Sequence, residues 1–350
     1  MRVAVIGGGL AGLSCALELT SDGADVVVLE GGDRFGGQVR TTRERGFVVE
    51  EGADGFEPGH GELRALLEQL RLTDELVAPQ LLPTLVLERL NGAHTFVQGP
   101  AAEAAVPPLT LRPGMGGLPR ALTRRLESRT DLRVGNAAVA LSRTAGGWTV
   151  YPESGPSISV EGLVVAVPPR AAAWLLHPAC PGAARPLAGL TVRSLIVVSL
   201  AYRRQDVAHP LDAAGFIVPR ARGDEGLEVC TFVTSTLDAR APGDAVLLRA
   251  QLRPARGELA GTTDDGWVQG AHGALTPILG VRAAPQVAWV ARWSDALPVV
   301  NGAYRERVSD ARASLRERGP AEFAGAAYDA PGLDGALRSG REAARRLMGR

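Results

Sequence analysis

Two periodic patterns of apolar residues open the chain. The stretch VAVI at 3–6 is continuously apolar and predicts a buried strand, whereas the spacing from Leu10 to Leu17 predicts an amphipathic helix. A glycine cluster separates the two patterns, and the run DVVVLE at 25–30 predicts a second buried strand. The order strand, glycine turn, helix and strand over residues 2–30 is typical of a nucleotide-binding α/β unit.

The rest of the chain divides into helical and strand-rich stretches. The pattern predicts helices at 61–77, 117–129 and 264–279, and a final helix closes the chain. The apolar run at 160–167 predicts a buried strand that two prolines end before another helix. Residues 190–290 are predicted to be mostly strands, because several stretches there are rich in branched and aromatic residues and are bounded by turn formers. Proline and glycine are frequent at 79–113, which predicts a loop or a crossing between domains.

The composition is that of an ordinary globular protein with balanced charge. Of the 350 residues, 45% are hydrophobic and 22% are charged, and 38 basic residues balance 38 acidic ones. This balance favours neither a nucleic acid nor another polyanion as a partner. Every basic residue apart from histidine is arginine, since the sequence contains no lysine. No pattern in the sequence determines the oligomeric state.

Cysteine and histidine spacing bears on redox setting and metal binding. Cys15, Cys180 and Cys230 are widely separated, which favours free thiols in a reducing, cytoplasmic setting over disulfides. The histidines show no pair at metal-ligand spacing, so we expect no metal site. The first strand begins at residue 2 or 3 without a cleavable leader, and apolar runs such as 194–202 are too short to span a membrane. We therefore expect a cytoplasmic protein, and peripheral contact with a membrane stays open.

The glycine cluster has the pattern Gly7-x-Gly9-x-x-Gly12. Glycines at this spacing give a tight turn, let the backbone approach a pyrophosphate and allow the helix to pack closely on the strand. Glu30 ends the second strand, where its carboxylate can accept hydrogen bonds from ribose hydroxyls. NAD and FAD both present a free 2′-hydroxyl there, so the cluster predicts a dinucleotide without choosing between the two.

Three further motifs make the choice. The stretch GGDRFGGQVRT (31–41) places glycines and arginines directly after the acid, and GFVVEEGADGF follows at 46–56. Near the other end, FAGAAYDAPGLDGALRSGREAA (323–344) reads as a strand, a glycine loop and a helix. Together these motifs resemble the large flavoprotein family that includes amine oxidases, phytoene desaturases and protoporphyrinogen oxidases. The resemblance is closest to protoporphyrinogen and coproporphyrinogen oxidases, through LRPGMGGLPRALTRRL (111–126) and WSDALPVVNGAYRERV (293–308).

The resemblance implies an FAD cofactor and a set of residues that contact it. The N-terminus of the last helix would stabilise negative charge on the reduced flavin. No side chain is assigned a catalytic role, because the protein mainly positions the substrate against the flavin. The implied cofactor contacts are Gly7, Gly9, Leu10, Ala11, Gly12, Glu30, Gly31, Arg34, Gly36, Gly37, the backbone of Val139, Tyr304, Gly325, Pro331, Gly332 and Leu333.

The resemblance also implies a reaction and a substrate region. The family removes hydrogens from a porphyrinogen, with hydride passing to the flavin and then to oxygen or another acceptor. Phe216 and Ile217 stand where the family places apolar residues against the substrate. Gln251 lies in the stretch RAQLRPAR, where the family has an aromatic residue followed by glycines. These three residues are the expected substrate contacts.

Other activities of the same family stay open. An amine oxidase or a carotenoid-desaturase-like oxidoreductase acting on another apolar compound is the first alternative, and a flavin-binding relative without catalysis is the second. Amine oxidases of this family commonly use a lysine near the flavin, and this chain has none. Porphyrinogen oxidases carry a long helical segment where only residues 57–110 remain here.

The predicted fold class is α/β, with a discontinuous Rossmann-like FAD-binding domain and a second, mixed-sheet substrate domain. Residues 1–58, 112–172 and 286–350 are predicted to form the FAD-binding domain. Residues 59–111 and 173–285 are predicted to form the substrate domain, where a small molecule would bind.

Overall fold

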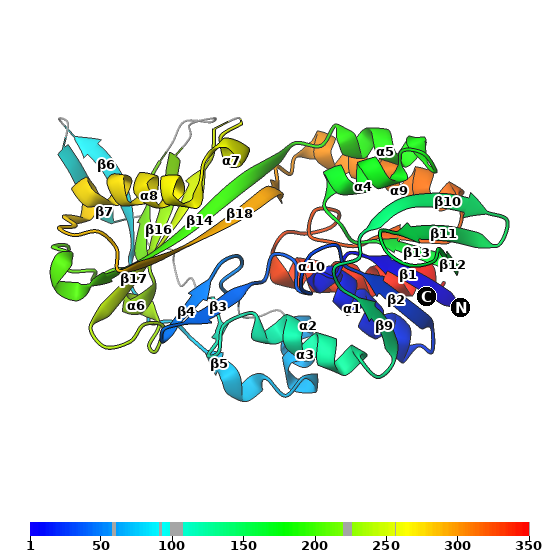
Figure 1. Ribbon diagram of the computed structural model, residues 1–350, viewed down its shortest axis with the longest axis horizontal. Helices are drawn as coiled ribbons and strands as arrows, with labels where there is room; N and C mark the ends of the chain where they lie inside the picture. The colour runs from blue at the N-terminus through cyan, green and yellow to red at the C-terminus, as the bar shows by residue number, and fades with distance from the viewer. Residues whose placement is uncertain (58–60, 91–92, 99–107, 220–225, 256, 350) are drawn as a thin grey trace.

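Two large β-sheets organise the chain and lie toward opposite ends of its long axis (Figure 1). The computed structural model describes residues 1–350 apart from 58–60, 91–92, 99–107, 220–225, 256 and 350. One sheet is parallel and five-stranded, and the other is mixed and seven-stranded. This arrangement confirms the predicted α/β class with a Rossmann-like unit and a second mixed sheet.

The parallel sheet explains the continuous apolar runs of the sequence. In β1 (Arg2–Ile6), Val3 and Val5 face one core, while Ala4 and Ile6 face another. A strand buried on both faces has no polar side, so its sequence does not alternate. The strand order is β19 (Ala321–Phe323), β13 (Gly162–Val165), β1, β2 (Asp25–Leu29) and β9 (Thr130–Arg133).

Different elements cover the two faces of this sheet. The face of Val3 and Val5 packs in one core with α1 (Leu10–Ser21), α2 (Gly61–Gln69), α3 (Gly117–Leu126) and α10 (Gly332–Leu347). The face of Ala4 and Ile6 packs in a second core with a three-stranded antiparallel sheet and three helices. These are β10 (Ala138–Thr144), β11 (Gly147–Pro152), β12 (Ile158–Val160), α4 (Pro169–Leu176), α5 (Pro181–Ala188) and α9 (Gly302–Glu317).

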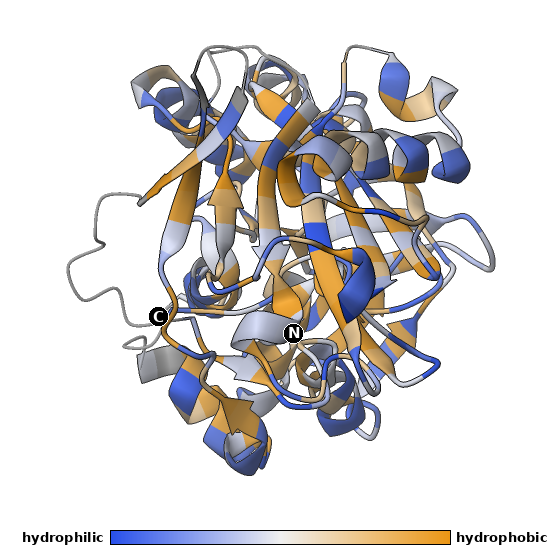
Figure 2. Cartoon of the chain, turned by 90° about the vertical axis from the view of Figure 1, so that its left-hand side faces the viewer, coloured by the Kyte–Doolittle hydropathy of each residue, from blue (hydrophilic) through white to orange (hydrophobic). Residues whose placement is uncertain are grey.

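The mixed sheet is covered by a helix on one face. Ile196, Val198 and Leu200 on β14 (Val192–Arg203) pack in a core with Trp267 and Leu275 of α8 (Asp264–Leu279). Figure 2 views this end of the molecule and shows the strands mainly orange with scattered blue positions. The order is β18 (Val287–Pro298), β14 (Val192–Arg203), β17 (Ala245–Arg253), β16 (Gly226–Phe232), β15 (Gly215–Ile217), β6 (Thr84–Leu90) and β7 (Ala93–Gln98).

The opposite face of the mixed sheet, which we call the open face, is turned toward the part of the molecule built around the parallel sheet, which we call the FAD-binding half after the cofactor predicted for it. At one end it is covered by the hairpin of β3 (Thr41–Glu44) and β4 (Phe47–Glu50), whose Phe47 ring lies 5.3 Å from that of Trp289. Further along, the indole of Trp293 donates a hydrogen bond to the carbonyl of Glu51 at 2.6 Å. The segment after β4 therefore crosses the open face and joins the two halves.

Two local predictions differ from the structure. The helix predicted at 61–77 ends at Gln69, because Arg71 adopts a left-handed conformation with φ of 57°. A short 3₁₀ turn (Thr73–Glu75) and β5 (Leu76–Val77), which pairs with β8 (Thr110–Leu111), follow. The predicted loop at 79–113 contains the hairpin β6–β7, which pairs with the distant strand β15. Residues 99–107 of that stretch lie outside the described residues.

The short remaining elements are a 3₁₀ turn (Arg204–Asp206), α6 (Val233–Thr236) and α7 (Glu258–Gly261). Sheet membership also departs from the predicted boundaries. Strand β18 belongs to the mixed sheet, although residues 286–350 were assigned to the FAD-binding domain. Helices α2 and α5 pack on the parallel sheet, although they were assigned to the substrate domain. The chain crosses between the two halves several times, and local sequence patterns do not show at which residue each crossing occurs.

Candidate active site

The first glycine loop lies between the end of β1 and the start of α1. Gly7 has a φ of +108°, and a Cβ there would lie 2.6 Å from the carbonyl oxygen of Ala166. A Cβ on Gly12 would lie 1.9 Å from the carbonyl oxygen of Gly7, so only glycine allows this contact between helix and turn. Gly9 caps the helix in an extended conformation without any side-chain hydrogen bond to the first turn.

Consequently, the first-turn amides of α1 are free of a side-chain cap. Leu10 and Ala11 bury their side chains, so these residues can reach a ligand only through the backbone. Uncapped amides and the positive end of the helix dipole suit a phosphate. The geometry thus fits the pyrophosphate contact predicted for this loop.

Glu30 lies where two loops meet at the end of β2. Its Oε2 accepts a hydrogen bond from the amide of Gly8 at 2.7 Å, and its Oε1 accepts one from the amide of Gly32 at 2.7 Å. Each carboxylate oxygen retains a further lone pair for a ribose hydroxyl. Gly31, between them, sits against Ala137, whose Cβ would be 3.0 Å from an added Cβ.

The second glycine loop packs on the first. Gly36 donates its amide to the carbonyl of Gly8 at 2.8 Å, and it adopts a φ of +118°. A Cβ on Gly37 would lie 3.0 Å from the Cα of Gly9. Arg34 donates to the carbonyls of Gly37 at 2.9 Å and Val39 at 3.0 Å, and burial lowers the pKa of its guanidinium. Arg34 therefore shapes the second loop, and its predicted contact with the cofactor stays a prediction.

The predicted adenine contact, Val139, lies on β10 beside the acidic end of β2. The amide of Asn136 donates to the carbonyl of Glu30 at 2.8 Å, which places this segment next to the predicted ribose site. The β10–β11 register shifts between Ala138 and Ala140, so Val139 has no partner in that ladder. Its backbone contact with adenine stays a prediction.

The C-terminal motif lies against the first one. The hydroxyl of Ser14 on α1 donates to the carbonyl of Leu337 on α10 at 2.9 Å. A Cβ on Gly340 would lie 2.1 Å from the carbonyl oxygen of Ala11, so the two helices are in backbone contact. Further along α1 the contacts also lie further along α10, from Ala11 against Gly340 to Glu18 against Arg345, so the two helices run roughly parallel.

The N-terminus of α10 consequently points the same way as that of α1. Pro331 caps α10 in an extended conformation with no side-chain hydrogen bond, and Gly332 follows with a φ of +85° and open space where a Cβ would lie. Leu333 is partly buried against the core of the FAD-binding half. These residues fit the flavin-ring contact that the resemblance implies, because an uncapped helix start can face the ring. Gly325 is held at a φ of +143° before this helix.

Tyr304 lies on α9, with only 5% of the residue exposed. Its hydroxyl donates to the carbonyl of Ala327 at 2.9 Å, and burial raises its pKa to about 12. Tyr304 thus contacts the segment that leads to α10. Its direct contact with the flavin stays a prediction.

The expected substrate residues divide between the two faces of the mixed sheet. Ile217 is 45% exposed and Gln251 is partly exposed, and both lie on the open face. Phe216 is fully buried in the core under α8, with its ring 5.4 Å from that of Phe96. Because neighbours in a strand point to opposite faces, Phe216 and Ile217 cannot both face one substrate. The expectation for Phe216 is therefore wrong, and Ile217 and Gln251 stay candidates.

The structure adds buried charges that sequence patterns did not indicate. Glu50 accepts hydrogen bonds from Thr41 at 2.6 Å and from the amide of Met115 at 2.8 Å, and its Oε1 lies 3.4 Å from Nη1 of Arg240. Burial raises the pKa of Glu50 and lowers that of Arg240. Arg249 donates to the carbonyls of Glu50 at 3.2 Å and Gly52 at 2.5 Å. In the sequence, the signal for these contacts is Arg249, a single arginine within the apolar strand VLLRAQL.

The described residues include no group of three or more His, Cys, Asp or Glu side chains placed to hold a metal ion. Within the same ranges, no helix combines the length and apolar character needed to cross a bilayer. Bound FAD would supply a hydride acceptor at this site, and the chain's own groups would bind and orient it.

The chain is an FAD-dependent oxidoreductase: its match to a flavoprotein family shows this class of protein, and the two glycine loops, Glu30 and the helix start at Pro331 fit it. It belongs to the family described as flavin containing amine oxidoreductase, which matches residues 10–86 and 85–348.

Curated relatives include enzymes of porphyrinogen oxidation. The chain is 24% identical to a coproporphyrinogen III oxidase of Propionibacterium freudenreichii subsp. freudenreichii, over 98% of this chain and 90% of that protein. That alignment runs over 479 positions, more than the 350 residues here, so it contains gaps in this chain. The chain is also 27% identical to the protoporphyrinogen oxidase of Bos taurus, over 69% of this chain and 51% of that protein.

Solved structures share the fold. A putative protoporphyrinogen oxidase from Exiguobacterium sp. 255-15 superposes with a TM-score of 0.86 at 20% identity, covering 100% of this chain and 99% of that one. Cyclohexylamine oxidase from Brevibacterium oxydans superposes with a TM-score of 0.77 at 15% identity, covering 99% and 98% of the two chains. The same fold therefore serves enzymes named for different substrates.

Proposed function

We propose that this FAD-dependent oxidoreductase removes hydrogens from a porphyrinogen, protoporphyrinogen IX or coproporphyrinogen III, as a step of haem biosynthesis. Electrons leave the flavin to oxygen or another acceptor. The similarity to coproporphyrinogen III oxidase over 98% of this chain is the observation that carries the proposal.

The open face of the mixed sheet supports a broad, mainly apolar substrate. A single row of paired residues crosses six strands on this face. Its accessible part covers β6, β15, β16 and β17, and strands about 4.8 Å apart make that part roughly 14 Å long, because the members on β14 and β18, Val197 and Ala291, are only 1% and 6% exposed. Most members are apolar, and one amide interrupts them. The row is Val86, Ile217, Val229, Gln251, Val197 and Ala291.

The row also faces the correct half of the molecule for a reaction at FAD. Arg249, two residues before Gln251 on the same strand face, donates to the carbonyl of Gly52 in the FAD-binding half. Trp293 does the same for the carbonyl of Glu51. A large flat molecule lying on the row would therefore sit between the sheet and the FAD-binding half.

The absence of lysine weighs against amines as substrates. Lysine is the residue that amine oxidases of the family commonly place near the flavin, and no side chain of this sequence can replace its ammonium group with the same flexibility. A porphyrinogen requires no such group.

Anaerobic reduction of the purified, FAD-loaded protein tests the proposal. Coproporphyrinogen III or protoporphyrinogen IX is expected to bleach the flavin absorbance without oxygen, whereas putrescine and cyclohexylamine leave the spectrum unchanged. Because conversion of a porphyrinogen to the porphyrin removes six electrons and one flavin accepts two, the fluorescent porphyrin is expected only after air is admitted as the further electron acceptor. Bleaching by an amine and by neither porphyrinogen would overturn the assignment while leaving the FAD enzyme intact.

A further inference from the structure

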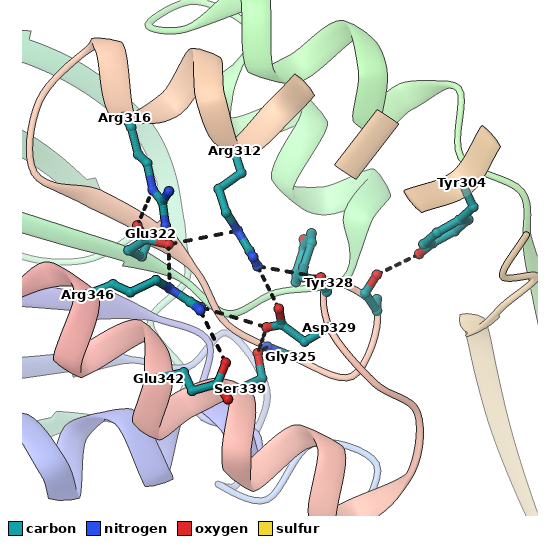
Figure 3. A network of polar contacts seen from close by, with 11 residues as sticks. Tyr304, Arg312, Arg316, Glu322, Gly325, Tyr328, Asp329, Ser339, Glu342 and Arg346 are labelled. Atoms are coloured by element: carbon teal, nitrogen blue, oxygen red, sulfur yellow. Dashed lines mark hydrogen bonds and ion pairs between the residues drawn. The ribbon is translucent and has the colours of Figure 1, made fainter. Parts of the chain in front are cut away.

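Residues 325–331 connect β19 to α10 and lead directly to the predicted flavin contacts at Pro331 and beyond; we call them the connecting segment. Side chains of α9 and α10 and the backbone carbonyl of Val167, which follows β13, hold it (Figure 3). The hydroxyl oxygen of Ser339 on α10 accepts a hydrogen bond from the amide of Gly325 at 2.9 Å. The hydroxyl of Tyr304 on α9 donates one to the carbonyl of Ala327 at 2.9 Å. Tyr328, itself buried, donates its hydroxyl to the carbonyl of Val167 at 2.7 Å.

Asp329 is the charged centre of these contacts. Its Oδ1 accepts a hydrogen bond from Nη2 of Arg312 at 3.1 Å, and its Oδ2 accepts one from the hydroxyl of Ser339. Nη2 of Arg346 lies 4.0 Å from the same Oδ2. The Asp329 side chain is 19% exposed, so these charges are only partly screened by water.

Ser339 links the two ends of the connecting segment. A serine hydroxyl has one proton to donate, and that of Ser339 is donated to Asp329 while its oxygen accepts from Gly325. Ser339 is fully buried on α10, two turns past the start of that helix. The same side chain therefore ties residues 325 and 329 to the helix that they introduce.

The network contains three arginines, and the Asp329 carboxylate is one of the three carboxylates that balance their charge. Three arginines, Arg312, Arg316 and Arg346, surround the buried carboxylate of Glu322 at 3.9, 2.5 and 3.4 Å. Glu342 adds a second carboxylate, 3.2 Å from Arg346 and on the outer side of the network. Loss of the Asp329 charge would leave Arg312 with only the more distant Glu322.

Displacement of Asp329 would pass directly to the start of α10. Only Ala330 separates it from Pro331, and the carbonyl oxygen of Ala330 lies 2.0 Å from where a Cβ on Gly335 would be. The segment thus enters the helix in backbone contact with its first turn. A shift there changes how the positive end of the helix dipole meets the flavin.

We propose that Asp329 is a positioning residue for FAD: through Ser339 and Arg312 it holds the start of α10 against the flavin ring and thereby favours the reduced, negatively charged cofactor. This role concerns the cofactor and is independent of which substrate the enzyme oxidises.

Asp329→Asn and Ser339→Ala test this role, with Glu342→Gln as the matched control from the same network. For each variant, the dissociation constant of oxidised FAD and the two-electron midpoint potential of bound FAD give the affinities for both redox states. Both test variants are expected to lose about tenfold more affinity for reduced than for oxidised FAD, which corresponds to a potential lower by about 30 mV. Glu342→Gln is expected to stay within about twofold of the unmodified protein for both states, because surface ion pairs contribute little.

Thermal unfolding of the apoproteins shows whether the fold is retained. If Asp329→Asn does not fold, Ser339→Ala decides alone, because it breaks the link without leaving an unpaired charge. Equal losses of affinity for both redox states would show that Asp329 only stabilises the fold and would overturn the proposal. A potential shift of the same size in Glu342→Gln would overturn it as well. Since no substrate is used, failure of the porphyrinogen assignment would leave these readings unaffected.

Discussion

Arg240 and Glu50 form an ion pair in which neither side chain reaches water: their exposed fractions are 3% and 7%, and Nη1 lies 3.4 Å from Oε1. Burial raises the pKa of the acid and lowers that of the base, so loss of hydration outweighs mutual attraction for both. Thr41, Met115 and Leu111 supply the hydrogen bonds that make this burial tolerable. The pair fixes the β3–β4 hairpin, the turn before α3 and the mixed-sheet half together.

Breaking this pair on one side is expected to cost more than removing both charges. Arg240→Met should lower the free energy of unfolding by about 3 kcal/mol, because it leaves Glu50 as an uncompensated buried charge. Glu50→Gln combined with Arg240→Met should recover at least about 1 kcal/mol of that loss. Urea unfolding at 25 °C measures both. Arg64→Met, on the exposed face of α2, is the control and should change stability by less than about 0.5 kcal/mol. Additive losses in the double variant would contradict the desolvation argument.

Glu50 should also impose a pH dependence of a definite sign. Because its pKa is raised in the folded protein above the ordinary 4.5, the folded state keeps a proton that the unfolded state has released. Its contribution to stability is therefore present below pH 4.5 and is lost as pH rises toward the raised pKa. The free energy of unfolding of the unmodified protein minus that of Glu50→Gln should fall over this range. A difference that grows with pH would mean that the ion pair dominates over burial.

The first glycine loop should tolerate no side chain. Gly12→Ala places a Cβ 1.9 Å from the carbonyl oxygen of Gly7, so α1 must move away from the turn. We expect at least about a hundredfold loss of FAD affinity, since a small displacement misaligns several amides at once. Gly273→Ala on α8, where an added Cβ meets nothing within 4 Å, is the control. It should leave FAD affinity unchanged, and titration of the apoprotein with FAD measures both. Equal affinities in the two variants would argue against this loop as the pyrophosphate site.

The two faces of β15 give contrasting variants. Phe216→Ala empties a buried site and should lower the free energy of unfolding by about 3–5 kcal/mol, with little change in the KM of the folded fraction. Ile217→Ala removes a half-exposed side chain and should cost less than about 1.5 kcal/mol of stability while raising the KM for the porphyrinogen. Gln251→Ala should act like Ile217→Ala, because it lies in the same row. A KM that responds to Phe216 and ignores both others would place the substrate elsewhere.

The FAD-binding half was largely predictable because its determinants are local. A glycine at position 12 is required by the carbonyl of Gly7 five residues earlier, and Glu30 directly follows the adjacent strand. The substrate half was not predictable in this way, because its arrangement depends on contacts between residues that are far apart in the sequence. A strand with period two has two faces, and only the position of α8 decides that Phe216 is covered while Ile217 is open. Glu50 and Arg240 are 190 residues apart, and no local pattern links them.

Strand β18 runs along the mixed sheet and is also bonded repeatedly to the FAD-binding half. Its Trp289 and Trp293 donate to Glu44 and to the carbonyl of Glu51, and the carbonyl of Ala296 accepts from Gln38. These hydrogen bonds resist hinge motion between the halves. Substrate entry should therefore depend on side chains at the rim of the open face. The same hydrogen bonds also make the two halves one cooperative unit. Addition of FAD should therefore slow amide hydrogen exchange in β14 and β18 as well as in the loops that hold the cofactor.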